Sequence, residues 1–276
     1  MRIDSHQHFW IYDAVKDAWI NEEMSSIRRN FLPNDIAGTL RTHGIAGVVA
    51  VQADQSAQET QFLLDLASMY ALIKGIVGWV DLQSTTLEEQ LQAYRKQPKI
   101  KGFRHIVEAE SDADFLMRPA VQQGMRLLTQ YGYSYDLLIR PRHYASTLAC
   151  VAAHPEQRFN LNHIAKPAIK SKAYAEWAEF IAQLSAYPNV YCKLSGLATE
   201  ADWHQWKLDD FADYVLHVIA CFGKKRIMFG SDWPVCLVAA SYAESMQIVA
   251  DKLGGFSAEE MDDFWGGNAV RFYNLH

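Results

Sequence analysis

The sequence predicts an α/β protein with the (β/α)8 architecture of a TIM barrel, formed by residues 1–276 as a single domain with one extra helix at the C-terminal end. The length of 276 residues suits a fold that typically needs about 250. Eight short apolar segments each precede a segment with helical periodicity. The first segment lacks the glycine fingerprint of a doubly wound nucleotide-binding sheet, which favours the closed barrel.

The elements follow one another in a regular order. We expect strands at residues 4–10, 47–53, 75–81, 100–107, 134–140, 158–163, 189–195 and 226–235. Pro33 to Thr42 is expected to be the first helix, and two capping boxes, Ser241 with Glu244 and Ser257 with Glu260, mark late helix starts. Residues 11–32 form a long connection after the first strand, a place that favours a lid or binding loop over an idle linker.

The composition narrows the class of protein. Half of the residues are hydrophobic, 21% are charged, and the net charge of −6 gives nucleic-acid binding no electrostatic support. The four cysteines have neither zinc-knuckle nor disulfide spacing, so we expect them to be reduced. No apolar run approaches the ~20 residues that span a bilayer, and no basic leader is visible. We therefore expect a cytoplasmic protein without a membrane partner, and homo-oligomer formation stays open.

Two histidines near the start of the chain form the first candidate site. In Asp4-Ser-His-Gln-His8, side chains two apart share one face of a strand, with His6 and His8 about 7 Å apart along the chain. Asp232 follows a second apolar run near the other end. A closed barrel makes the first and last strands neighbours, so these three residues should meet at the C-terminal rim, where barrel enzymes keep their chemistry.

Polar side chains also gather at the ends of all eight expected strands, whereas the strand centres are apolar. They are His6, His8, Gln52, Asp81, Arg104, His105, Arg140, His163, Lys166, Lys193, Ser195 and Asp232. This segregation favours an active site at the rim. Side chains along a strand alternate between the barrel interior and the helix layer, and the sequence does not fix the phase of each strand. For His105 and Lys193 a structural buried role is equally well supported.

The chemistry of this set is hydrolytic. His6, His8, His163 and Asp232 could hold one divalent ion, with zinc the first choice, and leave a position for water. The ion would polarise a carbonyl or lower the pKa of bound water, and Asp232 would serve as general base. Without a metal, Asp232 could still activate water while His6, His8 and Arg104 polarise the carbonyl. The sequence leaves the occupancy of the metal open.

Five motifs along the whole chain carry a family resemblance. They are Asp4-Ser-His-Gln-His-Phe-Trp10, Lys101-Gly-Phe-Arg-His105, Asn162-His-Ile-Ala-Lys-Pro167, Phe229-Gly-Ser-Asp-Trp-Pro234 and Gly267-Asn-Ala-Val-Arg-Phe-Tyr273. Together they resemble the amidohydrolase superfamily, and within it the subgroup of sugar-lactone and dicarboxylate lactonases. The fourth strand ends in Arg-His without a bridging lysine or glutamate, so a binuclear metal centre is not expected.

The resemblance implies roles for individual residues. His6 and His8 would form the metal or carbonyl-polarising pair, Asp232 would be the catalytic aspartate, and Arg104 and His105 would face the substrate. The expected catalytic residues are therefore Asp232, His163 and His105. Arg104, Gln52, Trp79, Lys166 and Trp233 are expected to bind the substrate, since aromatic and amide side chains suit a sugar ring. Each tryptophan could equally be a packing residue.

The leading functional hypothesis is a hydrolase of carbohydrate metabolism that opens a small aldonolactone, such as a fucono- or rhamnonolactone, to its sugar acid. An alternative substrate is a dicarboxylate lactone of the muconolactone or pyrone type, because cations lie near several strand ends: Arg104, Arg140, Arg142, Lys166 and Lys193. A related metal-dependent decarboxylase is a further alternative. A barrel that only binds a sugar acid is disfavoured because neither the base nor the histidine pair is missing.

Overall fold

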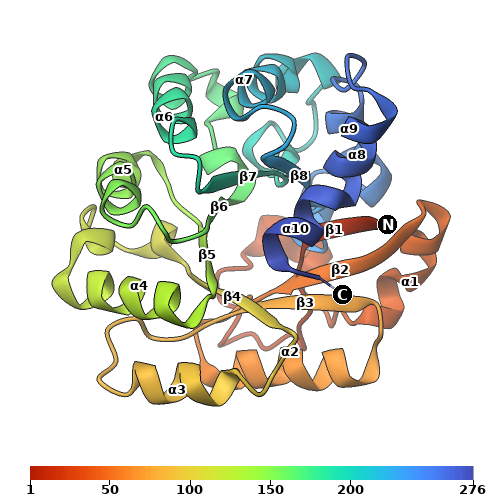
Figure 1. Cartoon of the computed structure of the whole chain (residues 1–276). Helices are drawn as coiled ribbons and strands as arrows, with labels where there is room; N and C mark the ends of the chain where they lie inside the picture. The colour runs from red at the N-terminus through yellow and green to blue at the C-terminus, as the bar shows by residue number, and fades with distance from the viewer. Residues whose placement is uncertain (276) are drawn as a thin grey trace.

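The computed structural model describes residues 1–275 and contains eight parallel strands, hydrogen-bonded in sequence order and surrounded by helices (Figure 1). The strands are β1 (Arg2–Gln7), β2 (Ile45–Val51), β3 (Ile73–Gly78), β4 (Ile100–His105), β5 (Ser134–Leu137), β6 (Phe159–Leu161), β7 (Val190–Leu194) and β8 (Ile227–Phe229). The predicted (β/α)8 barrel is confirmed. Most strands end two to six residues earlier than the sequence indicated, because their polar ends turn away into the rim loops.

The helices form a ring around the strands (Figure 1). They are α1 (Pro33–Thr42), α2 (Ala57–Met69), α3 (Leu87–Tyr94), α4 (Pro119–Tyr131), α5 (Tyr144–Ala153), α6 (Ala175–Ser185), α7 (Ala212–Phe222) and α8 (Tyr242–Ala250). Local signals explain several boundaries. Proline occupies the first turn of α1 and α4, Ser56 caps α2, and α4 ends at Gly132 in the left-handed conformation. The expected bounds of α1 are confirmed.

The barrel closes between the two ends of the sequence. The backbone N–H of Asp232 donates to the carbonyl of His6 at 2.9 Å, and that of His8 donates to Trp233 at 2.7 Å. These bonds join the carboxyl-terminal end of β1 to the segment just after β8, where Gln7 and Trp233 form a parallel bridge. Ring closure therefore aligns the segment that carries His6 and His8 directly with the segment that carries Asp232.

The last segment covers the amino-terminal end of the barrel, so that both chain ends lie close together (Figure 1). It comprises α9 (Ala258–Asp262), a π-helical turn (Asp263–Gly267) and α10 (Asn268–Tyr273). Both predicted capping boxes form, at Ser241 before α8 and at Ser257 before α9. Lys101 near the start of β4 donates to the Asn274 carbonyl at 2.8 Å, and the Tyr273 side chain enters the barrel interior. The opposite end of the barrel is left for a site.

The long connection 11–32 folds back over the carboxyl-terminal rim. An antiparallel bridge between Trp10 and Phe31 ties its two ends together, and their rings pack edge to face with centroids 5.5 Å apart. A short helix, Glu22–Ile27, lies within it, and Asp17 is buried. The loop is therefore an ordered cover with its own packing, and four of its residues line the pocket described below.

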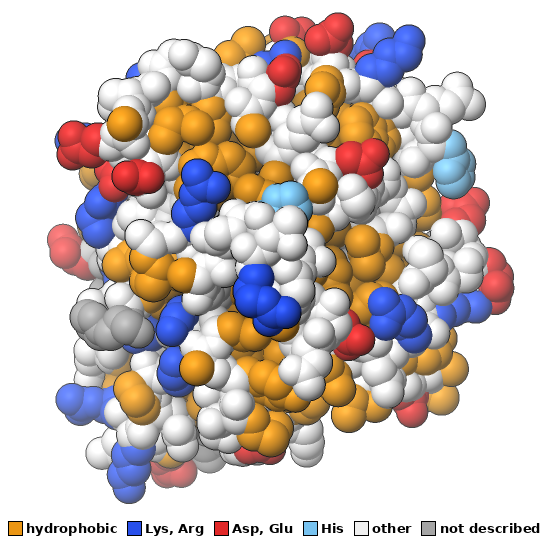
Figure 2. Space-filling model, turned by 90° about the vertical axis from the view of Figure 1, so that its right-hand side faces the viewer, with side chains coloured by type: hydrophobic (Ala, Val, Ile, Leu, Met, Phe, Trp, Pro, Cys, Tyr) orange, Lys and Arg blue, Asp and Glu red, His pale blue; other side chains and the backbone are white. Residues whose placement is uncertain are grey.

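Three further features concern the cysteines, the apolar character of the helices and the charged residues on the surface. The four cysteines are free, as expected. None of the helices formed by residues 1–275 has the length and apolar character needed to cross a membrane. On the face drawn in Figure 2, basic and acidic side chains are scattered among apolar ones.

Candidate active site

Three histidines and one aspartate converge at the carboxyl-terminal end of the barrel. The Asp232 Oδ1 atom lies 3.3 Å from Nε2 of His8 and 3.7 Å from Nε2 of both His6 and His163. The four side chains are buried, with exposed fractions of 5% or less. Ring closure brings His6, His8 and Asp232 together, as the sequence predicted, and β6 adds His163 from the other side.

Unusual backbone conformations aim two of these side chains. His163, Ile164, Ala165 and Lys166 all have positive φ between 46° and 63°, and Asp232 has φ of 61°. A left-handed conformation costs an L-residue roughly 1–2 kcal/mol, and a β-branched residue such as Ile164 rarely adopts it. A run of four such residues persists only where the surrounding packing holds it, and such strain clusters at functional sites. The left-handed turn 163–166 thus marks the site independently of its chemistry.

Neighbouring groups orient the imidazole rings. His8 Nδ1 lies 2.8 Å from the carbonyl of Val51, and His163 Nδ1 lies 2.9 Å from the hydroxyl of Ser195. A backbone carbonyl can only accept, so His8 carries its proton on Nδ1 and its Nε2 faces Asp232 with a free lone pair. This arrangement is the one commonly found for histidines that bind metals.

Burial keeps the imidazoles neutral, whereas neighbouring groups keep the carboxylate ionised. Desolvation lowers the pKa of His6 well below its usual value, and the charge of Lys193 adds to this shift. Desolvation also lowers the pKa of His8, and it lowers the pKa of His163 to about 3 against the opposing effect of Asp232. For Asp232, burial alone would raise the pKa, but His163, His8 and Lys166 outweigh it and the net shift is downward. Near neutral pH the cluster is an anionic base among neutral rings.

Arg104 supplies a fixed cation beside this cluster. Its guanidinium donates to the side chain and carbonyl of Gln52 at 2.6–3.0 Å and to Asn162 Oδ1 at 3.2 Å. Its Nη1 atom lies 3.4 Å from His6 Nε2. Gln52 therefore holds Arg104 in place, and Arg104 lines the pocket at the base of which Asp232 lies.

The pocket above the cluster has a volume of about 690 Å³. One wall is ionic: Glu108 accepts from Lys166 at 2.7 Å and from Arg140 at 3.1 Å, and Arg140 donates to Glu200 at 2.8 Å. Other lining residues are aromatic or apolar and come largely from the 11–32 loop and the segments after β7 and β8, including Trp10, Trp19, Met24, Trp203, Val235 and Val238. The pocket is large enough for one sugar-sized molecule.

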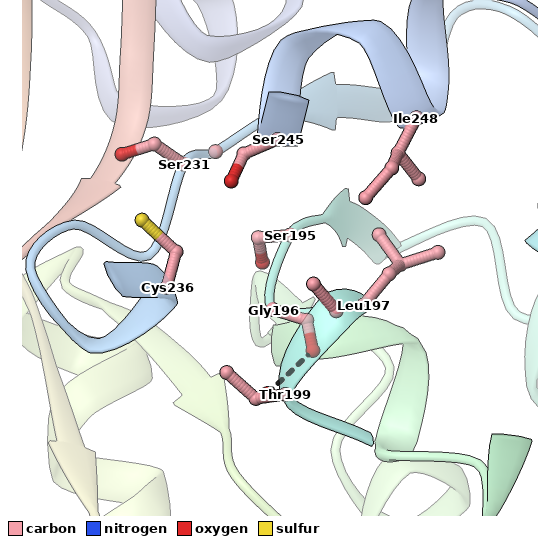
Figure 3. Close-up of a pocket in the computed structure, with 10 residues that line it drawn as sticks. Ser195, Gly196, Leu197, Thr199, Ser231, Cys236, Ser245 and Ile248 are labelled. Atoms are coloured by element: carbon pink, nitrogen blue, oxygen red, sulfur yellow. Dashed lines mark hydrogen bonds between the residues drawn. The ribbon is translucent and has the colours of Figure 1, made fainter. Parts of the chain in front are cut away.

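A second, much smaller cavity lies between the segment after β7 and the segments that follow β8 (Figure 3). Ser195, Gly196, Leu197 and Thr199, which follow β7, face Ser231, Cys236 and two residues of α8, Ser245 and Ile248. Its volume of about 10 Å³ is at the lower limit for one water molecule. It is therefore too small for a substrate, and the larger pocket is the candidate active site.

The structure separates the predicted substrate-binding residues into two groups. Arg104 and Lys166 line the pocket. The others do not line it. Gln52 is fully buried beneath Arg104, and Trp233 packs against Phe9 and Phe31. The Trp79 indole N–H points toward His105, 3.4 Å away.

Among the predicted catalytic residues, His105 is the one that lies apart from the cluster. Its Nε2 is 2.8 Å from Glu110, and its ring stacks on Phe115. Strand alternation explains the difference, since Arg104 points into the barrel and the next residue must point out of it. This position is the structural alternative that the sequence left open.

Several residues of the site escaped sequence analysis. Asp136 and Tyr273 form part of a buried network inside the barrel. The sequence placed Asp136 in a strand and Tyr273 at the end of a family motif, and it assigned a site role to neither. Glu108, Glu200 and Trp203 come from rim loops. Gly196 has φ of 60°, and a Cβ there would lie 2.6 Å from His163 Nδ1. A glycine directly after the end of a barrel strand was the available signal for that position.

The donor set can accommodate a divalent ion. His6, His8 and Asp232 offer ligand atoms that all lie within 4.8 Å of one another, and two imidazoles with a carboxylate suit zinc. His163 Nε2 lies 3.7 Å from the same carboxylate oxygen. The two nearby cations, Arg104 and Lys193, work against an additional positive charge at this point.

Comparison with known proteins gives the family. The model of the amidohydrolase family matches residues 3–275. The chain belongs to the amidohydrolase family.

Individual relatives agree with this placement. Two proteins named L-fucono-1,5-lactonase are similar over nearly their whole length. The one from Burkholderia multivorans is 38% identical and covers 100% of this chain and 96% of its own, and the one from Burkholderia ambifaria is 34% identical and covers 99% and 96%. A crystal structure of an amidohydrolase from Burkholderia multivorans with bound zinc superposes with a TM-score of 0.97 at 38% identity and full coverage of both chains.

Family membership explains the fold and the place of the site. Members of this family keep the barrel, so the rim cluster of this amidohydrolase is where its chemistry is expected. The predicted resemblance to the lactonase subgroup is confirmed.

Proposed function

We propose that the protein hydrolyses a sugar lactone of the L-fucono-1,5-lactone type to the corresponding sugar acid. The observation that carries this proposal is the Asp232 carboxylate, whose pKa is shifted downward, at the base of a pocket whose charged groups, Asp232 included, balance one another. A lactone needs one base for water and one electrophile for the carbonyl, and both lie within this cluster.

Asp232 is proposed as the general base. A water molecule beside its carboxylate would lose a proton to Asp232 while its oxygen attacks the lactone carbonyl carbon. The tetrahedral oxyanion would then collapse, the bond to the ring oxygen would break, and the departing alkoxide would take the proton that Asp232 had accepted. The three imidazoles hold the carboxylate at the position where this exchange occurs.

Arg104 and His6 are proposed to stabilise the developing oxyanion. The guanidinium is fixed by Gln52 and Asn162, so it needs no reorganisation when the negative charge appears. His6 Nε2 lies 3.4 Å from Arg104 Nη1, so both groups can donate a hydrogen bond to the same oxygen atom. Donors that are already oriented in a buried site act more strongly than the same groups in water.

A bound divalent ion would be held by His6, His8 and Asp232, with His163 adjacent. Such an ion would polarise the carbonyl or lower the pKa of water. The zinc bound in the similar Burkholderia multivorans amidohydrolase supports zinc as the ion.

The charge balance of the pocket favours a neutral substrate. Among the described residues, the lining carries four cations and four carboxylates: Lys16, Arg104, Arg140 and Lys166 against Asp54, Glu108, Glu200 and Asp232. Lys166 and Arg140 already bind Glu108, and Lys193 binds Asp136 inside the barrel. Arg142 donates to the backbone carbonyls of Glu108 and Glu110. Four of the five cations that suggested a dicarboxylate substrate are thus bound to other groups, which leaves Arg104 for the lactone carbonyl. A polyhydroxylated ring therefore suits the wall better than a dicarboxylate.

The names of the relatives point in the same direction. Two whole-length relatives above 30% identity are both called L-fucono-1,5-lactonase. The aromatic residues Trp10, Trp19 and Trp203 in the lining can pack against the carbon face of a sugar ring, while the ionic wall can bind its hydroxyl groups.

The proposal is tested with purified protein and a pH indicator, because each lactone opened releases one proton. The panel contains L-fuconolactone, L-rhamnonolactone, a stereoisomeric aldonolactone and 2-pyrone-4,6-dicarboxylate, each with and without chelator. We expect turnover of the deoxysugar lactones above all others. Preferred turnover of the dicarboxylate, or release of carbon dioxide without ring opening, would contradict the proposal.

A further inference from the structure

Lys193 is a buried charged residue that the proposed mechanism does not use. Its side chain, at the end of β7, is fully enclosed by the barrel. Its Nζ lies 2.7 Å from Asp136 Oδ2 and 3.3 Å from Nδ1 of His6. A buried ion pair of this kind rarely stabilises a fold more than apolar packing would, so its contact with His6 calls for another explanation.

The carboxylate of Asp136 is surrounded by hydrogen-bond donors. Besides Lys193, it accepts from the hydroxyl of Tyr273 at 2.9 Å and from Nδ2 of Asn162 at 2.9 Å. The amide orientation of Asn162 is fixed independently, because Arg104 can only donate and binds its oxygen. Asp136 therefore faces three donors, and the ion pair with Lys193 is the shortest of these contacts.

Lys193 forms an ion pair with Asp136 at an N···O distance of 2.7 Å, and an ammonium group has no lone pair. Nδ1 of His6 must then accept from Lys193, and the neutral ring carries its proton on Nε2. The opposite tautomer would direct an N–H at the ammonium and remove one of the two acceptors, His6 Nδ1 and Asp136 Oδ2, that face Lys193 in this fully buried site.

The proton position of His8 is compatible with a proton on Nε2 of His6. His8 holds its proton on Nδ1 toward Val51, so its bare Nε2 can accept from Nε2–H of His6, 3.1 Å away. Arg104 Nη1 also approaches His6 Nε2, but at 3.4 Å, and it already donates to Asn162 at 3.2 Å. The shorter contact and the complementary proton positions favour the pair of histidines.

We propose that Lys193, held by Asp136, is a positioning residue that fixes the proton of His6 on Nε2, which makes His6 a hydrogen-bond donor to the lactone carbonyl and a weak metal ligand. The donor role rests on the proposed lactone hydrolysis, whereas the proton position does not. A metal ligand needs a free lone pair, so an ion bound at His6 and His8 would first have to displace this proton. Lys193 would thereby set the balance between the donor and ligand roles of one histidine.

The first experiment reads the tautomer directly. Two-dimensional 15N NMR of the whole protein labelled in its histidines distinguishes Nε2–H from Nδ1–H rings, and the signals of His6 are assigned by their loss in His6→Asn. We expect His6 as Nε2–H and His8 as Nδ1–H in the metal-free protein. Detection of Nδ1–H at His6 would overturn the proposal, and this reading does not depend on how the Lys193 variants fold.

The second experiment changes the pair without changing the net charge. In the double variant Lys193→Met/Asp136→Asn, Arg104 becomes the cation nearest to the ring, so His6 should shift toward Nδ1–H. Zinc affinity, measured by competition with a chromophoric chelator, should rise by about tenfold or more, the size usual for groups behind a metal ligand. Tyr273→Phe serves as the matched control, since it removes one donor to Asp136 and keeps Lys193 against His6.

The outcomes separate this inference from the proposed function. A folded double variant with the wild-type tautomer and zinc affinity, or a Tyr273→Phe protein with the same changes as the double variant, would mean that Lys193 only fills the barrel. If the tautomers match and no lactone is hydrolysed, the positioning role survives and the proposed function fails. If the lactone is hydrolysed and His6 carries its proton on Nδ1, the proposed function survives and the positioning role of Lys193 fails.

Discussion

The Oδ1 atom of Asp232 lies 3.3 Å from Nε2 of His8, although the two residues stand near opposite ends of the chain. The backbone enforces this contact, because Asp232 donates to the carbonyl of His6 and His8 donates to that of Trp233 where the barrel closes. The geometry of the reacting groups is thus part of the closure of the fold. Rigid strand ends place such groups more accurately than mobile loops can.

The protonation states of Asp232 and the imidazoles predict that kcat/KM does not fall as the pH decreases from neutral to mildly acidic values. Activity requires ionised Asp232 and neutral imidazoles. The pKa of Asp232 is below its usual 3.8 and that of His163 is about 3, so both states persist as the pH falls until it passes these values. After subtraction of spontaneous hydrolysis, kcat/KM should stay constant from about pH 7 to about pH 5. An acid limb with a midpoint near 6.5, the ordinary value for histidine, would contradict this account.

Glu108→Gln should shift the preference of the pocket toward anions. Glu108 neutralises Lys166 and Arg140, and the variant leaves both cations without this carboxylate. We expect kcat/KM for a neutral lactone to fall about tenfold and inhibition by a small dicarboxylate to strengthen about tenfold, a change of roughly 1.4 kcal/mol in each case. Glu110→Gln is the matched control, because Glu110 pairs with His105 away from the pocket. Equal inhibition constants in the two variants would refute the role of the ionic wall.

Gly196→Ala should reduce activity more than its backbone strain explains. The residue has positive φ, and its new Cβ would lie 2.6 Å from His163 Nδ1 and 3.1 Å from Asp232 Oδ2. Strain should cost about 1–2 kcal/mol of stability, and displacement of His163 should lower kcat/KM by about tenfold or more.

Gly132→Ala provides the comparison, because Gly132 also has positive φ but a Cβ there meets nothing within 4 Å. It should lose similar stability in urea unfolding and keep its activity. An active Gly196→Ala protein would show that the site tolerates movement of His163.

His105→Gln tests a role that sequence and geometry assign differently. The resemblance suggested a substrate-facing catalytic residue, whereas the side chain lies against Glu110 and Phe115. We expect kcat/KM to stay within about threefold of wild type and the free energy of unfolding to fall by about 1 kcal/mol, since one hydrogen bond is weakened. A loss of activity above a hundredfold in a folded protein would restore the catalytic role.

The sequence predicts the architecture well because the barrel is encoded in repeated local patterns. The apolar segments, the helix starts at Pro33 and Pro119 and the neighbouring ends of the chain follow from periodicity, turn residues and closure. These features need no knowledge of side-chain direction. The meeting of His6, His8 and Asp232 could be predicted for the same reason.

Other parts of the site depend on information that the patterns do not contain. The phase of β4 decides that Arg104 faces the pocket while His105 faces Phe115, and only the packed structure fixes it. The left-handed turn from His163 to Lys166 contains no glycine, so the sequence gives no sign of its positive φ values. Tyr273 reaches Asp136 from the far end of the barrel, a contact between elements that no local pattern relates.

Asp232→Asn tests the central claim most directly. The amide keeps the size of the side chain and can still contact the histidines, but it cannot accept a proton from water. With L-fuconolactone as substrate, kcat should fall by about 10²–10⁴-fold or more, while circular dichroism and the unfolding transition remain close to wild type. A folded Asp232→Asn protein that hydrolyses the lactone at the wild-type rate would contradict the account.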